Sequence, residues 1–234
     1  MSDNRKRKVA AIVLAAGSGR RMGADVTKQR MELLGKSVLC RTVEAFDNAS
    51  EVDTITVVAK SDEIDFAKQA AMGASKPINF IIGGKTRAES AKIGFCSLDD
   101  SVEFVMIHDG ARCLVTPDLI NKVAAAAYIH GAATAASRVT DTLKRIDDNG
   151  MISATVARDG LMAVQTPQAF SRELYSRALG AVGTVDETIT DDNMLVERIG
   201  NTVYPVISED ENIKITKMSD IAYAEFILRK RQEK

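Results

Sequence analysis

The chain contains no tryptophan, two histidines and three cysteines, and its charges almost cancel. Cys40, Cys96 and Cys113 lie far apart without a CxxC pair, which argues against a disulfide framework or a zinc site and is typical of a reducing cytoplasm. The 31 Lys and Arg residues stand against 32 Asp and Glu, a net charge of −1. The overall charge therefore gives no indication of binding to nucleic acid or to a membrane surface.

Long hydrophobic runs are also missing. The apolar segment 9–16 is far shorter than the ~20 residues of a membrane-spanning helix. The Gly-Ser-Gly-Arg-Arg that follows it is not the cleavage site of a secretory signal. At 234 residues and 45% hydrophobic, the chain can bury one sizeable core. We predict one domain over residues 1–234, located in the cytoplasm, with no further fused enzyme domain.

Val- and Ile-rich runs alternate with helical patterns through the first half of the chain. This alternation is typical of βαβ units in a mostly parallel sheet, and predicts an α/β fold with helices on both faces. Thr116-Pro117-Asp118 is a strong helix start, because it offers an N-cap hydroxyl, a proline at the first helical position and an acid in the first turn. The predicted strands are 9–15, 54–59, 78–82 and 102–107, and the predicted helices are 38–49, 62–72, 87–98 and 116–130.

The pattern changes after Gly131. Short strands are predicted at 132–139, 142–146 and 151–156, with Asp-Asp-Asn-Gly at 147–150 as the hairpin turn. No helical pattern separates them, so we predict a β-arm over about residues 138–158 that projects from the main sheet. The rest of the chain is predicted to form a strand at 161–165, helices at 172–179 and 191–199, a strand at 202–206 and a last helix at 219–229.

Glycine and positive charge follow the first strand. The segment 17–22 lacks the third glycine of GxGxxG, and the chain has no GxxxxGK[ST], so neither common phosphate-binding loop is present. Arg20, Arg21 and Lys28 nevertheless lie around a glycine-rich backbone whose N–H groups can approach an anion. Guanidinium groups hold phosphate oxygens bidentately, and together these cations suit a polyphosphate. The alternative is a solvated basic loop.

Two further strand ends carry similar residues. Gly83-Gly84-Lys85-Thr86-Arg87 follows the third strand, and His108 to Arg112 follows the fourth. Because the carboxyl ends of parallel strands share one edge of a sheet, these segments predict a common anion site.

Taken in order, these motifs resemble those of the 2-C-methyl-D-erythritol 4-phosphate cytidylyltransferase family. The resemblance extends over residues 9–226. It implies a Rossmann-like domain whose β-arm embraces a second subunit in a homodimer, and transfer from CTP, with Mg²⁺, to a sugar-alcohol phosphate with release of pyrophosphate. The shared motifs are residues 14–22, Lys28-Gln29, Gly83-Gly84 with Arg87 and Ser90, His108-Asp109 with Arg112, Asp141-Thr142 with Lys144, Thr166-Pro167-Gln168, 189–192 and 212–216.

The resemblance also implies roles for individual residues. Arg21 and Lys28 match the pair that stabilises the transition state, and Arg158 and Lys214 match residues that position the acceptor phosphate. Thr142, on the arm, would serve the neighbouring subunit. The metal ligands are not assigned. Positions matching the family's CTP site are Ala15, Ala16, Gly17, Gly84, Arg87 and Ser90, and positions matching its acceptor or metal-nucleotide site are Asp109, Arg112 and Thr142.

The implied chemistry needs no general base, since the acceptor phosphate, with a second pKa near ~6, is largely ionised at neutral pH. We therefore interpret His108 as a structural hydrogen-bonding residue. Some positions depart from the family pattern: Thr27 and Cys113 stand where it usually has proline, Lys85 where it often has an acid, and Gly110 where it has alanine. None of these changes removes a cation from the site.

Two alternatives stay open. The first is a cytidylyltransferase acting on ribitol 5-phosphate, which would need the same cations. The run Ala15-Ala16-Gly17 favours the methylerythritol enzyme over the Ala-Gly-Gly of ribitol enzymes. The second is a catalytically silent nucleotide-binding regulatory protein, which would have no need for Arg21, Lys28, Arg158 and Lys214 together. Neither alternative involves nucleic acid or a membrane.

Overall fold

A computed structural model describes residues 6–17, 27–183, 185–208 and 210–233. Within this part of the chain, seven strands form a central sheet in the order β11-β7-β10-β6-β1-β4-β5. Strand β10 runs antiparallel to both neighbours, and the other pairings are parallel. The sheet strands are β1 (Val9–Leu14), β4 (Thr54–Ala59), β5 (Ile78–Ile82), β6 (Phe104–Asp109), β7 (Ala132–Arg138), β10 (Met162–Ser171) and β11 (Tyr204–Ile207).

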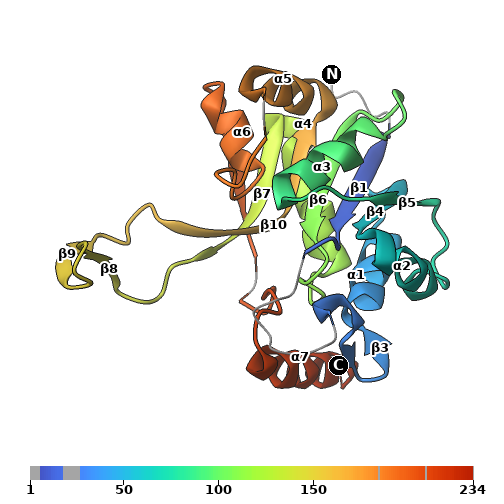
Figure 1. Cartoon of the computed structure of the whole chain (residues 1–234), viewed down its shortest axis with the longest axis horizontal. Coiled ribbons are helices and arrows are strands. Elements are labelled where there is room, and N and C mark those ends of the chain that lie inside the picture. The colour runs from blue at the N-terminus through green and yellow to red at the C-terminus, as the bar shows by residue number, and fades with distance from the viewer. Residues whose placement is uncertain (1–5, 18–26, 184, 209, 234) are drawn as a thin grey trace.

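Helices cover both faces of the sheet, as predicted (Figure 1). All six residues of β1 are buried, and they alternate between two cores. Ala11 and Val13 face the core formed with α1, α2 and α4, whereas Ala10 and Ile12 face the core formed with α3, α5 and α6. The helices are α1 (Val38–Asp47), α2 (Ile64–Ala70), α3 (Arg87–Cys96), α4 (Pro117–His130), α5 (Arg172–Val182), α6 (Asn193–Arg198) and α7 (Met218–Gln232), with short 3-10 helices η2 (Lys28–Arg30) and η3 (Ser61–Glu63).

The start and end of α4 follow from local chemistry. The Thr116 side chain accepts a hydrogen bond from the Leu119 N–H, and Pro117 takes the first helical position, where no N–H is needed. Gly131 ends the helix at φ 78°, a left-handed conformation that costs glycine little. The predicted helix is confirmed at both ends.

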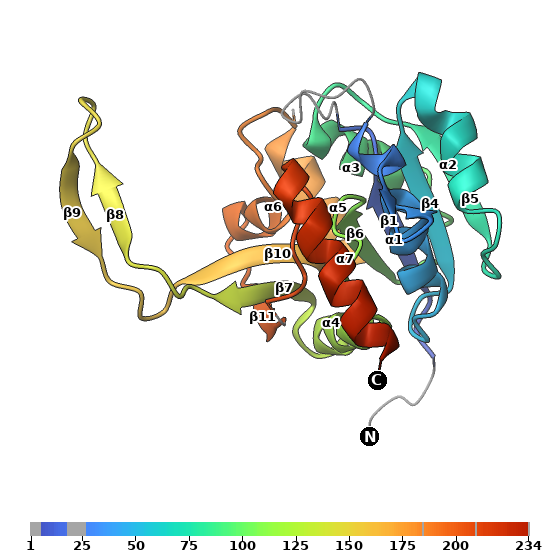
Figure 2. The same cartoon turned by 90° about the horizontal axis from the view of Figure 1, so that it is seen from below.

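The order of the strands places a topological switch point beside β1. From β1 the chain passes to β4 and β5 on one side, then returns to β6 on the other side. The carboxyl ends of β1 and β6 therefore lie beside a topological switch point, where open α/β sheets bind ligands. Helix α7 lies along this edge and packs on its own small core, which includes Leu33, Leu114 and Ile227 (Figures 1 and 2).

The predicted arm is present as a hairpin. Strands β8 (Leu143–Ile146) and β9 (Ile152–Val156) pair antiparallel and extend away from the rest of the molecule (Figures 1 and 2). The turn is stabilised by the Asp147 carboxylate, which accepts hydrogen bonds from the N–H groups of Asn149 and Met151, and by Gly150 at φ 77°. Exposed apolar side chains on the hairpin include Ile146, Met151 and Ile152.

Several predicted boundaries were wrong. The strand predicted at 161–165 is β10, which continues through Thr166-Pro167-Gln168 to Ser171. The predicted helix at 62–72 is divided into η3 and α2, and the last helix begins at Met218 and continues to Gln232. The short hairpin β2 (Glu32–Leu33) and β3 (Lys36–Ser37) was not predicted. No helix in the described part of the chain combines the length and apolarity needed to cross a membrane.

Candidate active site

Asp109, the last residue of β6, is the centre of a charged cluster at the switch point. Its Oδ1 accepts a hydrogen bond from Arg87 Nε at 3.0 Å, and its Oδ2 accepts one from Lys214 Nζ at 2.8 Å. Arg112 Nε lies 3.9 Å from the same Oδ2. The Ile215 N–H donates to the Ala111 carbonyl at 2.8 Å, which fixes the segment carrying Lys214 beside the end of β6. Three predicted cations therefore meet at one predicted carboxylate.

The charges in this cluster change each other's protonation. Burial alone would raise the pKa of Asp109, but the positive charges of Arg87, Lys214 and Arg112 outweigh burial and hold this pKa well below its usual range. Burial lowers the pKa of Arg112, and the nearby Arg87 charge lowers it further. Asp109 is thus a permanent anion at neutral pH.

Arg87 bridges Asp109 to a second carboxylate. Its Nη1 donates to Asp192 Oδ2 at 2.7 Å, and the Asp192 side chain is completely buried. Although burial opposes the charged form, Asp192 and Asp109 raise the pKa of Arg87 above its ordinary value. Nη2 of Arg87 is buried without a hydrogen-bond partner among the described residues.

The other oxygen of Asp192 is held from α5. The Tyr175 hydroxyl donates to Asp192 Oδ1 at 2.6 Å, and the Asp192 N–H donates to Gln168 Oε1 at 2.9 Å. Asp192 is the N-cap residue of α6, but its side chain makes no capping hydrogen bond, because its two oxygens accept from Tyr175 and Arg87. The neighbouring Asp191 carboxylate accepts from the Met194 N–H at 3.1 Å instead.

The surroundings of His108 and Cys113 indicate structural roles for both residues. The Asp109 N–H donates to Thr166 Oγ1 at 3.0 Å, and this hydroxyl lies 3.1 Å from His108 Nδ1. His108 Nε2 lies 3.2 Å from the Arg112 carbonyl, so we assign the proton to Nε2. Burial lowers the pKa of His108 to about 3, and burial raises the pKa of Cys113 to about 12. At neutral pH neither residue carries a charge, which agrees with the structural interpretation of His108.

The glycine loop after β5 packs against the end of β1. A Cβ on Gly83 would lie 2.8 Å from both Ala16 Cβ and Ser90 Oγ. The Gly84 N–H donates to Ser90 Oγ at 3.1 Å, and the Ser90 hydroxyl donates to the Thr86 carbonyl at 2.9 Å. Only glycine at position 83 allows this close approach, which brings the first two predicted nucleotide-binding segments together.

Arg112 is held by a series of hydrogen bonds through Asn212 that was not predicted from the sequence. Arg112 Nη1 donates to the Asn212 carbonyl at 3.0 Å. The Asn212 amide in turn donates to Gln165 Oε1 at 2.7 Å and to the Thr166 carbonyl at 3.0 Å. Asn212, two residues before Lys214, was the signal in the sequence for these hydrogen bonds, because an amide that becomes buried needs hydrogen-bond partners.

The remaining predicted residues belong to the segment that follows β1 and to the arm. Arg20 and Arg21 are outside the described residues, and Lys28 begins η2. Thr142 and Arg158 are exposed on the arm, where Arg158 donates to the Thr140 carbonyl. The arm extends away from the body, so within one chain these two residues do not join Asp109 (Figure 2).

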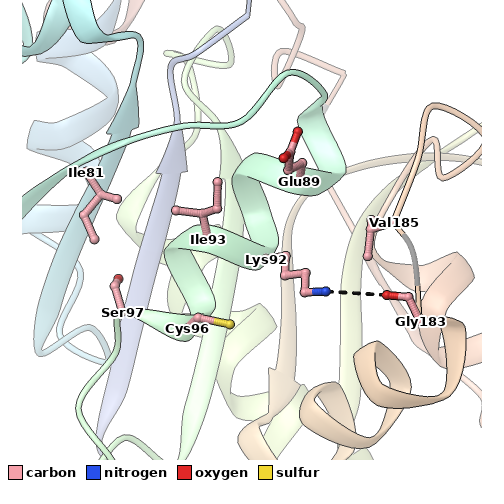
Figure 3. A pocket seen from close by; sticks show the side chains of 8 residues that line it. All are labelled: Ile81, Glu89, Lys92, Ile93, Cys96, Ser97, Gly183 and Val185. Carbon is pink, nitrogen blue, oxygen red and sulfur yellow. Dashed lines mark hydrogen bonds between the residues drawn. The ribbon is translucent and has the colours of Figure 1, made fainter.

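A separate surface cavity of about 570 Å³ lies beside the outer face of α3 (Figure 3). Ile81 and Ile93 line it together with Cys96, and Lys92 Nζ lies 3.5 Å from the Gly183 carbonyl. None of its lining residues belongs to the Asp109 cluster.

The described residues contain no group of three or more His, Cys, Asp or Glu side chains suited to holding a metal ion. All four oxygens of the two carboxylates in the cluster already accept hydrogen bonds: Asp109 accepts from Arg87 and Lys214, and Asp192 accepts from Arg87 and Tyr175. Mg²⁺ is bound through carboxylate oxygens that are free to coordinate it, so these residues do not fit a resident Mg²⁺ site.

A mostly parallel sheet flanked by helices, with cations and glycine-rich turns at its switch point, defines a Rossmann-like α/β protein of the nucleotide-binding class. The model of the 2-C-methyl-D-erythritol 4-phosphate cytidylyltransferase (IspD) family matches residues 9–230, and the chain belongs to this family.

Relatives match over nearly their full length. The 2-C-methyl-D-erythritol 4-phosphate cytidylyltransferase of Synechococcus sp. (strain CC9902) is 41% identical over 222 residues, covering 94% of this chain and 97% of the relative. The crystal structure of the 4-diphosphocytidyl-2C-methyl-D-erythritol synthase of Anaerococcus prevotii is 32% identical, with a TM-score of 0.84, and covers 96% of this chain and 100% of that one. The cytidylyltransferase structure from Thermus thermophilus is 28% identical, with a TM-score of 0.74, covering 95% and 99%.

Proposed function

We propose that the protein transfers CMP from CTP to 2-C-methyl-D-erythritol 4-phosphate, forming 4-diphosphocytidyl-2-C-methyl-D-erythritol and pyrophosphate, a step that leads to isoprenoid precursors. The observation that carries this proposal is the arrangement around Asp109, where Arg87, Arg112 and Lys214 meet at the carboxyl edge of the sheet. Family membership identifies the anions that such a site would hold.

The reaction requires alignment and charge neutralisation. An oxygen of the acceptor phosphate forms a bond to the α-phosphorus of CTP, while the bond from this phosphorus to the bridging oxygen breaks and its electron pair leaves with pyrophosphate. The attacking oxygen is already ionised, so no proton has to be removed. We assign Arg21 and Lys28 to the charge that develops on the triphosphate, and Lys214 and Arg158 to the acceptor phosphate.

The nucleotide would lie over the loops that meet at Gly83. Ala15, Ala16 and Gly17 follow β1, and their small side chains would let a base approach the backbone there. Backbone donors and acceptors can distinguish the C4 amino group of cytosine from the carbonyl of uracil. Since the carboxylates of the cluster are already paired, we propose that Mg²⁺ arrives with the phosphates of CTP.

The arm suggests how the site is completed. Thr142 and Arg158 are placed too far out to serve their own Asp109 cluster, and the arm exposes apolar residues such as Ile146 and Ile152. We propose that the arm packs on a second copy of the chain in a homodimer and contributes Thr142 and Arg158 there. The cysteine usage of the sequence favours the cytoplasm as the compartment.

The test is an acceptor comparison. Purified protein with CTP and Mg²⁺ is expected to release pyrophosphate with methylerythritol 4-phosphate, and much less with ribitol 5-phosphate. A preference for ribitol 5-phosphate would instead identify the related cytidylyltransferase. Absence of turnover with both acceptors would support a silent nucleotide-binding protein.

A further inference from the structure

The Tyr175 side chain lies in apolar surroundings that would suit a phenylalanine equally well, apart from its hydroxyl. Its ring packs in an edge-to-face arrangement on Phe95, with centroids 5.0 Å apart, and stacks on Phe170 at 5.2 Å. The side chain is fully buried in the core between the sheet and α3, α5 and α6. Burying a hydroxyl is unfavourable unless it is hydrogen-bonded, and its partner is Asp192 Oδ1 at 2.6 Å. The hydroxyl therefore serves to hold Asp192 and is not needed to pack the core.

Asp192 passes this constraint to the active site. Its two oxygens have different partners, Tyr175 on Oδ1 and Arg87 Nη1 on Oδ2. Arg87 then uses Nε for Asp109 at 3.0 Å. A continuous series of charge-assisted hydrogen bonds thus runs from α5 to the end of β6. The orientation of the Arg87 guanidinium depends on both carboxylates, because each one holds a different nitrogen of the planar group.

We propose that Tyr175 is a positioning residue of the active site, whose hydroxyl fixes Asp192 and thereby orients Arg87 toward the nucleotide. This inference rests on the proposed function, in which Arg87 contributes to CTP binding. Without the hydroxyl, Asp192 can rotate to share both oxygens with the guanidinium, which turns the plane of Arg87 and weakens its bond to Asp109. The buried Nη2 of Arg87, which has no hydrogen-bond partner among the described residues, would change its direction together with the rest of the guanidinium.

Tyr175→Phe removes only the hydroxyl, and Tyr128→Phe is a matched control. Tyr128 also packs on a phenylalanine, Phe104 at 4.8 Å, and also donates to a carboxylate, Glu51 Oε2 at 2.8 Å. It lies on α4 and packs against the opposite face of the sheet. Both variants lose a tyrosine–carboxylate hydrogen bond, and a purely structural role predicts a loss of Tm with unchanged CTP binding in both, the larger loss falling on the fully buried Tyr175.

The experiment measures Kd for CTP by calorimetry, together with kcat/KM for CTP, in the wild type and both variants. Tyr175→Phe is expected to raise Kd and lower kcat/KM by roughly tenfold, the scale of one lost hydrogen bond to a charged group. Tyr128→Phe is expected to change each quantity by less than about twofold. Wild-type Kd and kcat/KM in Tyr175→Phe would overturn the proposal.

The double variant Tyr175→Phe/Asp192→Asn tests the route through Asp192. If Tyr175 acts only through Asp192, the double variant binds CTP no more weakly than Asp192→Asn alone, whereas multiplied effects would contradict the proposed route. If the wild type fails to turn over methylerythritol 4-phosphate but binds CTP, the proposed function fails and the calorimetric comparison still decides the role of Tyr175. If the wild type does not bind CTP, both proposals are overturned.

Discussion

Replacing Arg87 by lysine should destabilise the protein strongly although the charge is kept. Arg87 donates from Nε to Asp109 and from Nη1 to Asp192, and the Asp192 side chain is 0% exposed. A lysine ammonium is a single point of charge that cannot occupy both nitrogen positions. One buried carboxylate loses its cation, which costs about 3 kcal/mol in the free energy of unfolding. For a chain of this length, that corresponds to a decrease in Tm of roughly 6–12 °C.

The assay is thermal unfolding followed by circular dichroism, with Arg172→Lys as the control. Arg172 also donates to a carboxylate, Asp100 at 2.8 Å, and to the Asp99 carbonyl at 3.0 Å, but the Asp100 side chain is fully exposed, so Arg172→Lys should lower Tm much less than Arg87→Lys. If Arg87→Lys unfolds at the wild-type temperature, or if both variants lose the same Tm, the Asp109–Arg87–Asp192 connection does not stabilise the fold as argued.

Three further outcomes are expected. Because His108 is buried and neutral with a pKa of about 3, the unfolded chain binds a proton below pH ~6.5 that the folded chain does not. The free energy of unfolding should therefore fall with decreasing pH by up to ~1.4 kcal/mol per pH unit. Urea titrations should show a shallower dependence of this free energy on pH in His108→Gln, and an equal dependence in both proteins would refute the argument. Gly94→Ala should lower Tm, because the added Cβ would lie 2.7 Å from Ile12 Cγ2. Gly180→Ala should raise Tm slightly, because its Cβ would meet no atom within 4 Å and alanine favours the helix. A higher Tm for Gly94→Ala than for Gly180→Ala would contradict the packing of α3 on the sheet. Steady-state kinetics of Lys28→Ala should show a large loss of kcat with little change in KM for CTP, and an effect confined to KM would indicate uniform binding.

Much of the fold could be predicted because local signals agreed with the global pattern. The alternation of apolar strands and helical segments predicted the parallel part of the sheet, and Thr116-Pro117 predicted the start of α4. The strand end at Asp109 and the glycine turn at Gly83 could be assigned to one edge, because parallel strands align their carboxyl ends. This reasoning placed Arg87, Arg112 and Asp109 at one site from the sequence alone.

Other features depend on contacts that no local pattern contains. Arg87 and Asp192 are 105 residues apart, and neither residue indicates its partner. The length of β10 was underestimated because Pro167 lacks an N–H and normally marks the end of a strand, whereas here it lies at an irregularity of the β10–β7 pairing. The two short strands β2 and β3 carry too few residues for any periodicity. Tertiary packing decides each of these cases.

The central claim is that the charged cluster around Asp109 is the active site. The most direct test is the kcat/KM for pyrophosphate release by Asp109→Asn. Asp186→Asn is the control, because Asp186 is an exposed loop carboxylate that accepts a hydrogen bond from the Thr188 hydroxyl. Since Asp109→Asn removes the anion that gathers Arg87 and Lys214, we expect kcat/KM to fall by roughly 100-fold or more, while Asp186→Asn stays within about twofold of the wild type. A folded Asp109→Asn variant with wild-type kcat/KM would contradict the account.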